Sequence, residues 1–255
     1  MSQLVNHPAG LFVTLIVLLS VAAALGAVVL HRFVPLHEDA RENYTVVQGA
    51  TLTLLALLIG FTLSMAVGRY DQRKNYEEEE ANAIGTEYVR ADLIGGSDAA
   101  KLKALLAQYL QLRVEYYTTR DRAELDDINR KTSDLESQLW ASVRDAAAAK
   151  PTPITALVVT GMNDVLNTQG YTQAAWLNRI PVSAWGLMML IAFFSNLMQG
   201  YGVRGETGRR VLLFVLPITV SLSLSLIADI DSPRGGLIRV VPQNLLLVQQ
   251  SMPSN

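Results

Sequence analysis

The chain has 255 residues, of which 50% are hydrophobic, with a formal net charge of −2 and a mean hydropathy of +0.25. The near-neutral charge, without a large basic patch, argues against nucleic acid as a partner. The absence of cysteine excludes disulfides, thiolate metal sites and cysteine nucleophiles.

Charged side chains are concentrated in the middle of the chain. Residues 69–179 hold 31 of the 44 charges, 14 basic and 17 acidic, whereas 11–30, 46–68, 180–203 and 211–228 hold none. Because an apolar helix of about 20 residues crosses a bilayer, these four segments are predicted to be transmembrane helices. The first could instead be a signal peptide, but no Lys or Arg precedes it and no clear cleavage site follows, so we favour a retained anchor.

The second predicted span is the reference for the other segments. The polar residues 31–44, which precede this span, are expected to form a tight turn outside the bilayer. The span Val46–Gly68 then leaves the bilayer at Arg69 and is expected to continue as a helix into water. Small residues recur every four positions, a spacing that lets membrane helices approach closely: Gly60, Ser64 and Gly68.

Residues 69–179 have the apolar periodicity of helices. Apolar side chains recur at steps of three and four between Leu102 and Tyr117, and more sparsely as far as Leu139. Breaks at Gly95-Gly96 and at 150–153 predict three helices, the second uninterrupted between the two breaks. The acidic residues Glu77 to Glu80, Glu87 and Asp92 are interpreted as a solvated face, with a cation site or a charged vestibule wall as the alternative.

The predicted fold is an all-α integral membrane protein with four transmembrane helices in a 2+2 arrangement around a long helical insert. Its parts are residues 1–68 with two spans, the helical domain 69–179, residues 180–228 with two spans, and the tail 229–255. Four spans would place both termini and the insert on one side of the membrane.

The last span carries the remaining polar pattern. Ser221, Ser225 and Asp229 follow Pro217 at four-residue steps. They indicate either the wall of a transport pathway or hydroxyls bonded to the carbonyl four residues earlier. His7, His31 and His37 lack metal-ligand spacing, and no nucleophile elbow, phosphate-binding loop or zinc-protease motif is present. We therefore predict that the protein is not an enzyme and has no metal or other cofactor.

The end of the second span resembles a known family. Gly60-Phe61, seven residues and Arg69-Tyr70 are similar to the Gly-Phe-x7-Arg-Trp pattern of bestrophin anion channels. A longer block resembles the bacterial bestrophin-like proteins: Phe61 and Ser64, then Arg69, Tyr70, Asp71 and Arg73, then Glu80-Ala81-Asn82-Ala83-Ile84-Gly85-Thr86.

This resemblance implies a homo-oligomer, with five subunits favoured, in the lipid bilayer of the bacterial inner membrane. The second span would line a central pore for inorganic ions, with a constriction formed by Phe61, Leu57 and Thr53. Thr53 departs from the apolar pattern of bestrophins, and the acidic run that clasps calcium there is missing here. The resemblance also places the insert and both termini in the cytoplasm.

Three hypotheses follow. The first is an ion channel, conducting anions by resemblance, although the glutamate run would favour cations. The second is a non-conducting scaffold or sensor whose helical lobe presents the Leu102–Tyr117 face to a partner protein. A transporter ranks third, because only the last span contains an internal proline.

Overall fold

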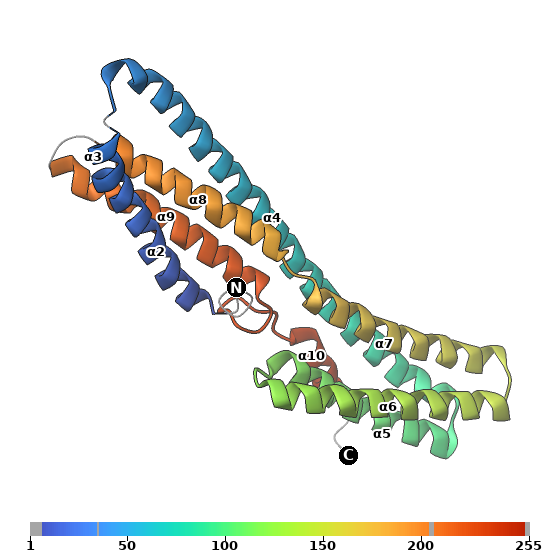
Figure 1. The fold of residues 1–255 in the computed structure, drawn as a ribbon. Helices are drawn as coiled ribbons and strands as arrows, with labels where there is room; N and C mark the ends of the chain where they lie inside the picture. Colours follow the sequence, from blue (N-terminus) through green and yellow to red (C-terminus); the bar gives the residue numbers. More distant parts are fainter. Residues whose placement is uncertain (1–6, 35, 204–206, 253–255) are drawn as a thin grey trace. The chain divides into compact units, whose positions relative to one another are not determined.

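The computed structural model describes residues 7–34, 36–203 and 207–252, and the regular elements in these ranges are all helical (Figure 1). Contacts divide the chain into two compact units: unit 1 is 1–68 with 179–239, and unit 2 is 69–178 with 240–255. The helices are α2 (Pro8–Leu25), the π-helix η1 (Gly26–Leu30), α3 (His31–Phe33), α4 (Glu38–Arg90), the 3-10 helix η2 (Ala91–Leu93), α5 (Gly96–Thr118), α6 (Arg122–Ala149), α7 (Pro153–Leu177), α8 (Val182–Gly202), α9 (Thr207–Asp231) and α10 (Gln243–Ser251).

Among the described residues, four helical stretches are long and apolar enough to cross a membrane, and they contain nearly all of the four uncharged segments of the sequence. The second span is part of a 53-residue helix, α4. The predicted turn over residues 31–44 is therefore wrong in its second half, because α4 already begins at Glu38. Glu38 and Asp39 lie in its first turn, where negative charge complements the helix dipole.

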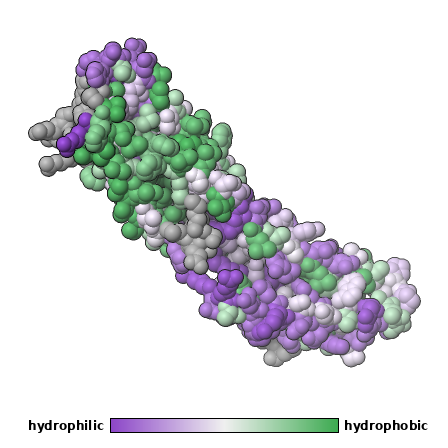
Figure 2. All heavy atoms as spheres, viewed as in Figure 1, coloured by the Kyte–Doolittle hydropathy of each residue, from purple (hydrophilic) through white to green (hydrophobic). Residues whose placement is uncertain are grey.

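In unit 1, α2 packs against α8 and α9. The buried residues of α2 follow helical spacing: Leu11, Leu15, Leu19, Ala22 and Ala23. Apolar side chains also predominate on the surface of these helices, whereas polar side chains predominate on unit 2 (Figure 2). This division matches a protein with one part in lipid and another in water.

Two glycines allow the backbones of unit 1 to touch. A Cβ at Gly200 of α8 would overlap the carbonyl oxygen of Ala23, and a Cβ at Gly26 would overlap that of Leu197. Small residues permit this approach in lipid, where dispersion rather than the hydrophobic effect holds helices together. Close packing within the chain thus occurs at glycines that the sequence analysis did not single out.

Unit 2 is a helical bundle formed by α5, α6, α7, α10 and residues 69–90 of α4. The predicted helix between the Gly95-Gly96 and 150–153 breaks is in fact two helices. Thr119 is extended and the Asp121 carboxylate accepts the N–H of Glu124, which caps the start of α6. Because of this break, α6 packs along α5 instead of extending it.

The core of unit 2 is apolar and is drawn from all of these helices. It includes Ile84, Leu102, Leu106, Leu110, Leu139, Met162, Val165 and Leu245. The Leu102–Tyr117 face that was proposed to bind a partner is therefore buried within the unit. The positive φ of Gly95 (69°) and Gly96 (61°) explains the break before α5, because glycine enters this region without strain.

We predict that Gly200→Ala destabilises the protein. The added methyl group must separate α8 from α2, and overpacking of this kind typically costs about 1–3 kcal/mol. The midpoint of thermal unfolding in detergent should fall. Gly186→Ala is the matched control on the same helix, because its Cβ would meet nothing within 4 Å in the described chain. Equal midpoints for the two variants would contradict the packing described here.

Candidate functional site

The apolar segment of α4 has one covered and one open side in the single chain. Leu55, Thr62 and Ala66 are buried in unit 1. Leu57 is 51% exposed and Phe61 67% exposed, and Thr53 is exposed as well. The three residues predicted to form a constriction thus share the open side, at four-residue steps along the helix.

Thr53 presents a less polar surface than its residue type suggests. Its hydroxyl donates to the carbonyl oxygen of Gly49 at 2.9 Å, within the same helix. The hydroxyl is therefore satisfied locally, and the methyl group is the part of the side chain left to face away from the helix. The departure from an apolar triplet is smaller than residue type alone suggests.

The small residues of α4 lie on this open side too. Gly60, Ser64 and Gly68 are not buried, and a Cβ at either glycine would meet nothing within 4 Å in the described chain. Within one subunit they do not bring α4 close to another helix. Any close approach at these positions has to come from another molecule.

The polar motif that follows Gly68 is divided between solvent and core. Asp71 and Asn82 are exposed, and Arg69 and Tyr70 are half-buried. Arg73 and Glu80, by contrast, are almost fully buried. The motif thus contributes both to the surface and to the interior of unit 2.

Glu80 is the centre of a buried polar network. It forms an ion pair with Arg113 of α5, and its carboxylate accepts hydrogen bonds from Tyr117 at 3.2 Å and Thr172 at 3.1 Å. The Arg113 guanidinium also lies over the Tyr116 ring, 4.4 Å from its centroid. Burial by itself lowers the pKa of Arg113, but Glu80 together with Tyr109 and Tyr117 raises it by more, so the pKa lies above its usual range.

Glu77 holds α10 against α4. One of its carboxylate oxygens accepts the backbone N–H groups of Asn244 (2.9 Å) and Leu245 (3.0 Å), and the other accepts the Asn244 amide at 2.7 Å. These N–H groups belong to the first turn of α10, where a carboxylate is favoured. This region was expected to be only a tail, although Pro242, shortly before an apolar run, is a helix-start signal.

Glu87 is buried without such partners. In the described part of the chain neither carboxylate oxygen has a hydrogen bond. A Cβ at Gly161 of α7 would overlap Oε2 of Glu87, so the glycine makes room for this carboxyl group. Burial raises the pKa of Glu87 to about 8; Arg90 counteracts the shift and Asp164 adds to it. Glu87 is therefore mostly protonated at neutral pH.

The interpretation of the acidic run as a solvated face is wrong for its main members. Glu77, Glu80 and Glu87 are buried, while Glu78, Glu79 and Asp92 remain at the surface. The buried carboxyl groups recur at helical spacing, on the side of α4 that packs into unit 2. Local sequence could not show this, because their partners lie far away along the chain.

At the C-terminal end of α9, two aspartates hold the neighbouring backbone in place. Asp229 accepts the N–H groups of Leu237 and Ile238, both at 2.8 Å. Asp231 is buried and accepts the N–H of Ile180 at 3.2 Å. Both carboxylates thus fix the backbone beside the last span.

The hydroxyls of Ser221 and Ser225 do not bond to the carbonyl four residues earlier, which was one of the two interpretations of this pattern. Thr219 and Ser223 bond to carbonyls four residues earlier, but the hydroxyls of Ser221 and Ser225 have no hydrogen-bond partner among the described residues. Across those residues, no group of three or more His, Cys, Asp or Glu could hold a metal ion.

Comparison with known families agrees with this architecture. A family model described as "Bestrophin-like domain" matches residues 17–245. The chain belongs to the bestrophin-like family. No curated protein matches it at the level of sequence.

Solved structures share the bestrophin-like fold. A bestrophin homolog from Klebsiella pneumoniae has a TM-score of 0.65 at 13% identity, over 94% of this chain and 99% of the other. A variant of that homolog, in which one tryptophan is replaced by alanine, has a TM-score of 0.66 at 12% identity, over 94% and 97% of the two chains. A further structure, described as a membrane protein with a proline replaced by alanine, has a TM-score of 0.63 at 13% identity, over 93% and 98%.

We predict that Arg113→Met strongly destabilises unit 2. It leaves the Glu80 carboxylate buried without its counter-ion, and breaking a buried pair typically costs about 3–5 kcal/mol. Chemical unfolding monitored by helical circular dichroism provides the measurement. The double variant Glu80→Gln/Arg113→Met should recover part of the loss. If Arg113→Met unfolds at the wild-type midpoint, the ion pair is unimportant for stability.

We also predict that stability falls as pH rises from about 4.5 to about 8 through Glu87. The folded state keeps the Glu87 proton over this range while the unfolded state loses it. Each pKa unit corresponds to about 1.4 kcal/mol. Glu87→Gln imitates the protonated form. The midpoint of thermal unfolding, measured at about pH 6 and at about pH 8.5, should therefore fall less in this variant than in the wild type.

Glu78→Gln is the control for this measurement, because Glu78 is an exposed carboxylate on the same helix. Its stability should depend on pH as the wild type does. Identical pH profiles for wild type and Glu87→Gln would show that the Glu87 carboxyl group is already ionised in the folded protein at neutral pH.

Proposed function

We propose that this bestrophin-like protein is an ion channel of the bacterial inner membrane, in which several copies surround a pore lined by residues 46–68 of α4. The main support is that, of the four spans, α4 is the least buried within one chain. In their most apolar windows, 17% of α4 is buried within the chain, against 33%, 33% and 50% for the other helices. The α4 segment therefore has the most surface left to cover or to line a pore.

The proposed constriction consists of Thr53, Leu57 and Phe61 from each subunit. Steps of four residues place these side chains on one side of the helix, about 6 Å apart along it. Rings of leucine and phenylalanine can close a narrow pore to ions by excluding water. Thr53 would add its methyl group to this surface, since its hydroxyl is bonded to Gly49.

Gly60, Ser64 and Gly68 would let neighbouring subunits approach α4. Five subunits are favoured by the resemblance to bestrophins. On the same basis, unit 2 and both termini are assigned to the cytoplasm; residues 1–6 and 253–255 lie outside the described residues.

The burial of three members of the acidic run bears on whether cations or anions would permeate. Glu77 and Glu80 are used in contacts within unit 2, and Glu87 is mostly neutral. These three groups contribute little negative field to a pore entrance, which weakens the argument for cations. Resemblance to bestrophins then favours anions.

The alternative, a non-conducting scaffold or sensor, loses its proposed binding surface. The Leu102–Tyr117 face is part of the core of unit 2. A scaffold would have to use another surface, and the described residues give no specific support for one. We therefore retain the channel as the proposed function.

The test is current recording from purified protein in planar lipid bilayers. We predict a conductance for the wild type that increases in the double variant Phe61→Ala/Leu57→Ala, because removing the two large side chains widens the constriction. The control is Phe214→Ala/Leu222→Ala on α9, with the same residue types at 54% exposure each. This control should conduct like the wild type.

Two results would contradict the proposal. One is the absence of conductance in both the wild type and the Phe61→Ala/Leu57→Ala variant, when folded protein is present in the bilayer. The other is an equal change of conductance in the α9 control, which would show that the α4 residues have no special position.

A further inference from the structure

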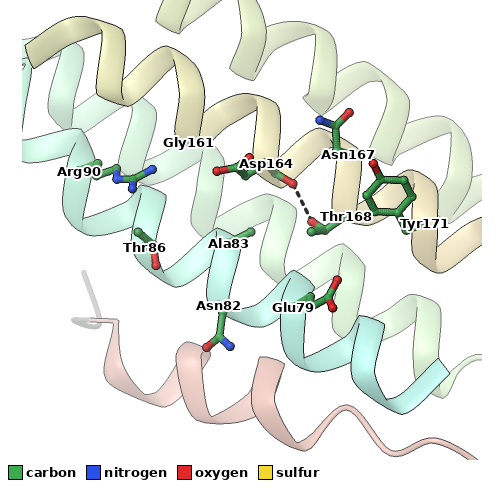
Figure 3. A pocket seen from close by; sticks show the side chains of 10 residues that line it. All are labelled: Glu79, Asn82, Ala83, Thr86, Arg90, Gly161, Asp164, Asn167, Thr168 and Tyr171. Carbon is green, nitrogen blue, oxygen red and sulfur yellow. Dashed lines mark hydrogen bonds between the residues drawn. The ribbon is translucent and has the colours of Figure 1, made fainter. Parts of the chain in front are cut away.

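An open pocket of about 460 Å³ lies between α4 and α7, entirely within unit 2 (Figure 3). This volume is within the range of about 300–1,000 Å³ that is typical of small-molecule sites. The residues of the lining that could recognise a ligand are Glu79, Asn82, Arg90, Asp164, Asn167 and Tyr171. None of them belongs to the proposed pore surface of α4.

The lining combines negative charge with an aromatic wall. Glu79 contributes a carboxylate from α4, and Asp164 contributes one from α7. The Tyr171 ring stacks on Tyr76 with 5.9 Å between centroids and 28° between the planes, which holds it in place. An ammonium group is attracted both by carboxylates and by the face of an aromatic ring.

A buried carboxyl group lies directly behind this lining. Glu87 is aimed at Gly161, which itself lines the pocket, and both of its oxygens lack a hydrogen bond within the described residues. Nη1 of Arg90 lies beside the same position, 2.6 Å from where a Cβ of Gly161 would be. Arg90 on α4 and Asp164 on α7 are the charged groups that act on Glu87.

The local charge therefore depends on Glu87. With Glu87 protonated, the lining holds two carboxylates, Glu79 and Asp164, and one guanidinium, Arg90, so a further positive charge would be stabilised. With Glu87 ionised, the negative excess is larger still. In both states the pocket is suited to a cation and not to an anion.

We propose that the pocket between α4 and α7 binds a small organic amine, with its ammonium groups between the Asp164 and Glu79 carboxylates and against the Tyr171 ring. Because the two carboxylates come from opposite helices, a linear diamine would offer one ammonium group to each. This inference does not depend on whether the protein conducts ions.

Binding is coupled to a proton. Asp164 adds to the raised pKa of Glu87, so an ammonium beside Asp164 offsets that contribution and lowers the pKa from about 8. Part of the Glu87 population then ionises, and amine binding near neutral pH releases protons. Non-specific binding of an amine to exposed carboxylates would not release protons, because those groups are already ionised.

The experiment is isothermal titration calorimetry of the full-length protein in detergent with 1,4-diaminobutane. We expect saturable binding whose apparent enthalpy differs between two buffers of different ionisation enthalpy, with the sign of proton release. Asp164→Asn should weaken binding roughly tenfold or more. Tyr171→Phe keeps the ring and should bind like the wild type, and 1,4-butanediol should not bind.

Two further variants distinguish amine binding from proton release. Glu87→Gln should still bind the diamine but without proton release. Asp134→Asn, at an exposed carboxylate on α6, should bind and release protons like the wild type. The absence of saturable binding, equal affinity in wild type and Asp164→Asn, or proton release that persists in Glu87→Gln would each overturn the proposal.

Discussion

The structure depends on one constraint, the continuity of α4 through two different solvents. In lipid a backbone must satisfy its own hydrogen bonds, so the span has to be helical. The buried residues of α4 form a single stripe at helical spacing, and this stripe continues beyond the membrane span. Leu55 and Ala66 belong to it in unit 1, and Arg73, Glu80 and Ile84 in unit 2. The spacing persists while the side chains change from mainly apolar ones to a mixture of charged and apolar ones.

The charged part of this stripe has to overcome the cost of removing carboxylates from water, and it does so in three ways. Glu80 is paired with a guanidinium and two hydroxyl groups. Glu77 receives the amides at the start of α10. Glu87 has no hydrogen bond in the described structure and instead holds its proton, as its raised pKa shows. The two paired groups fix neighbouring helices, whereas the third can respond to pH.

The sequence was sufficient for features that arise from local pattern. Uncharged segments of 18 or more residues identified the membrane helices, and the positive φ of Gly95 and Gly96 accounts for a predicted break. Apolar spacing in α5 indicated an amphipathic helix, although its apolar face was assigned to a partner protein and not to the core of unit 2. Local pattern also contained the cap at Asp121, but no proline or glycine marked that break, and sparse apolar spacing continued across it.

Features that depend on distant partners could not be predicted in this way. Glu80 is 33 residues from Arg113, and Glu77 is 167 residues from Asn244. A run of glutamates is therefore interpreted as solvated until its partners are known. The proposed constriction on α4 also depends on distant partners, which in this case are other subunits. Leu57 and Phe61 are open in one chain because, in the proposed channel, the surfaces that face them belong to neighbouring subunits.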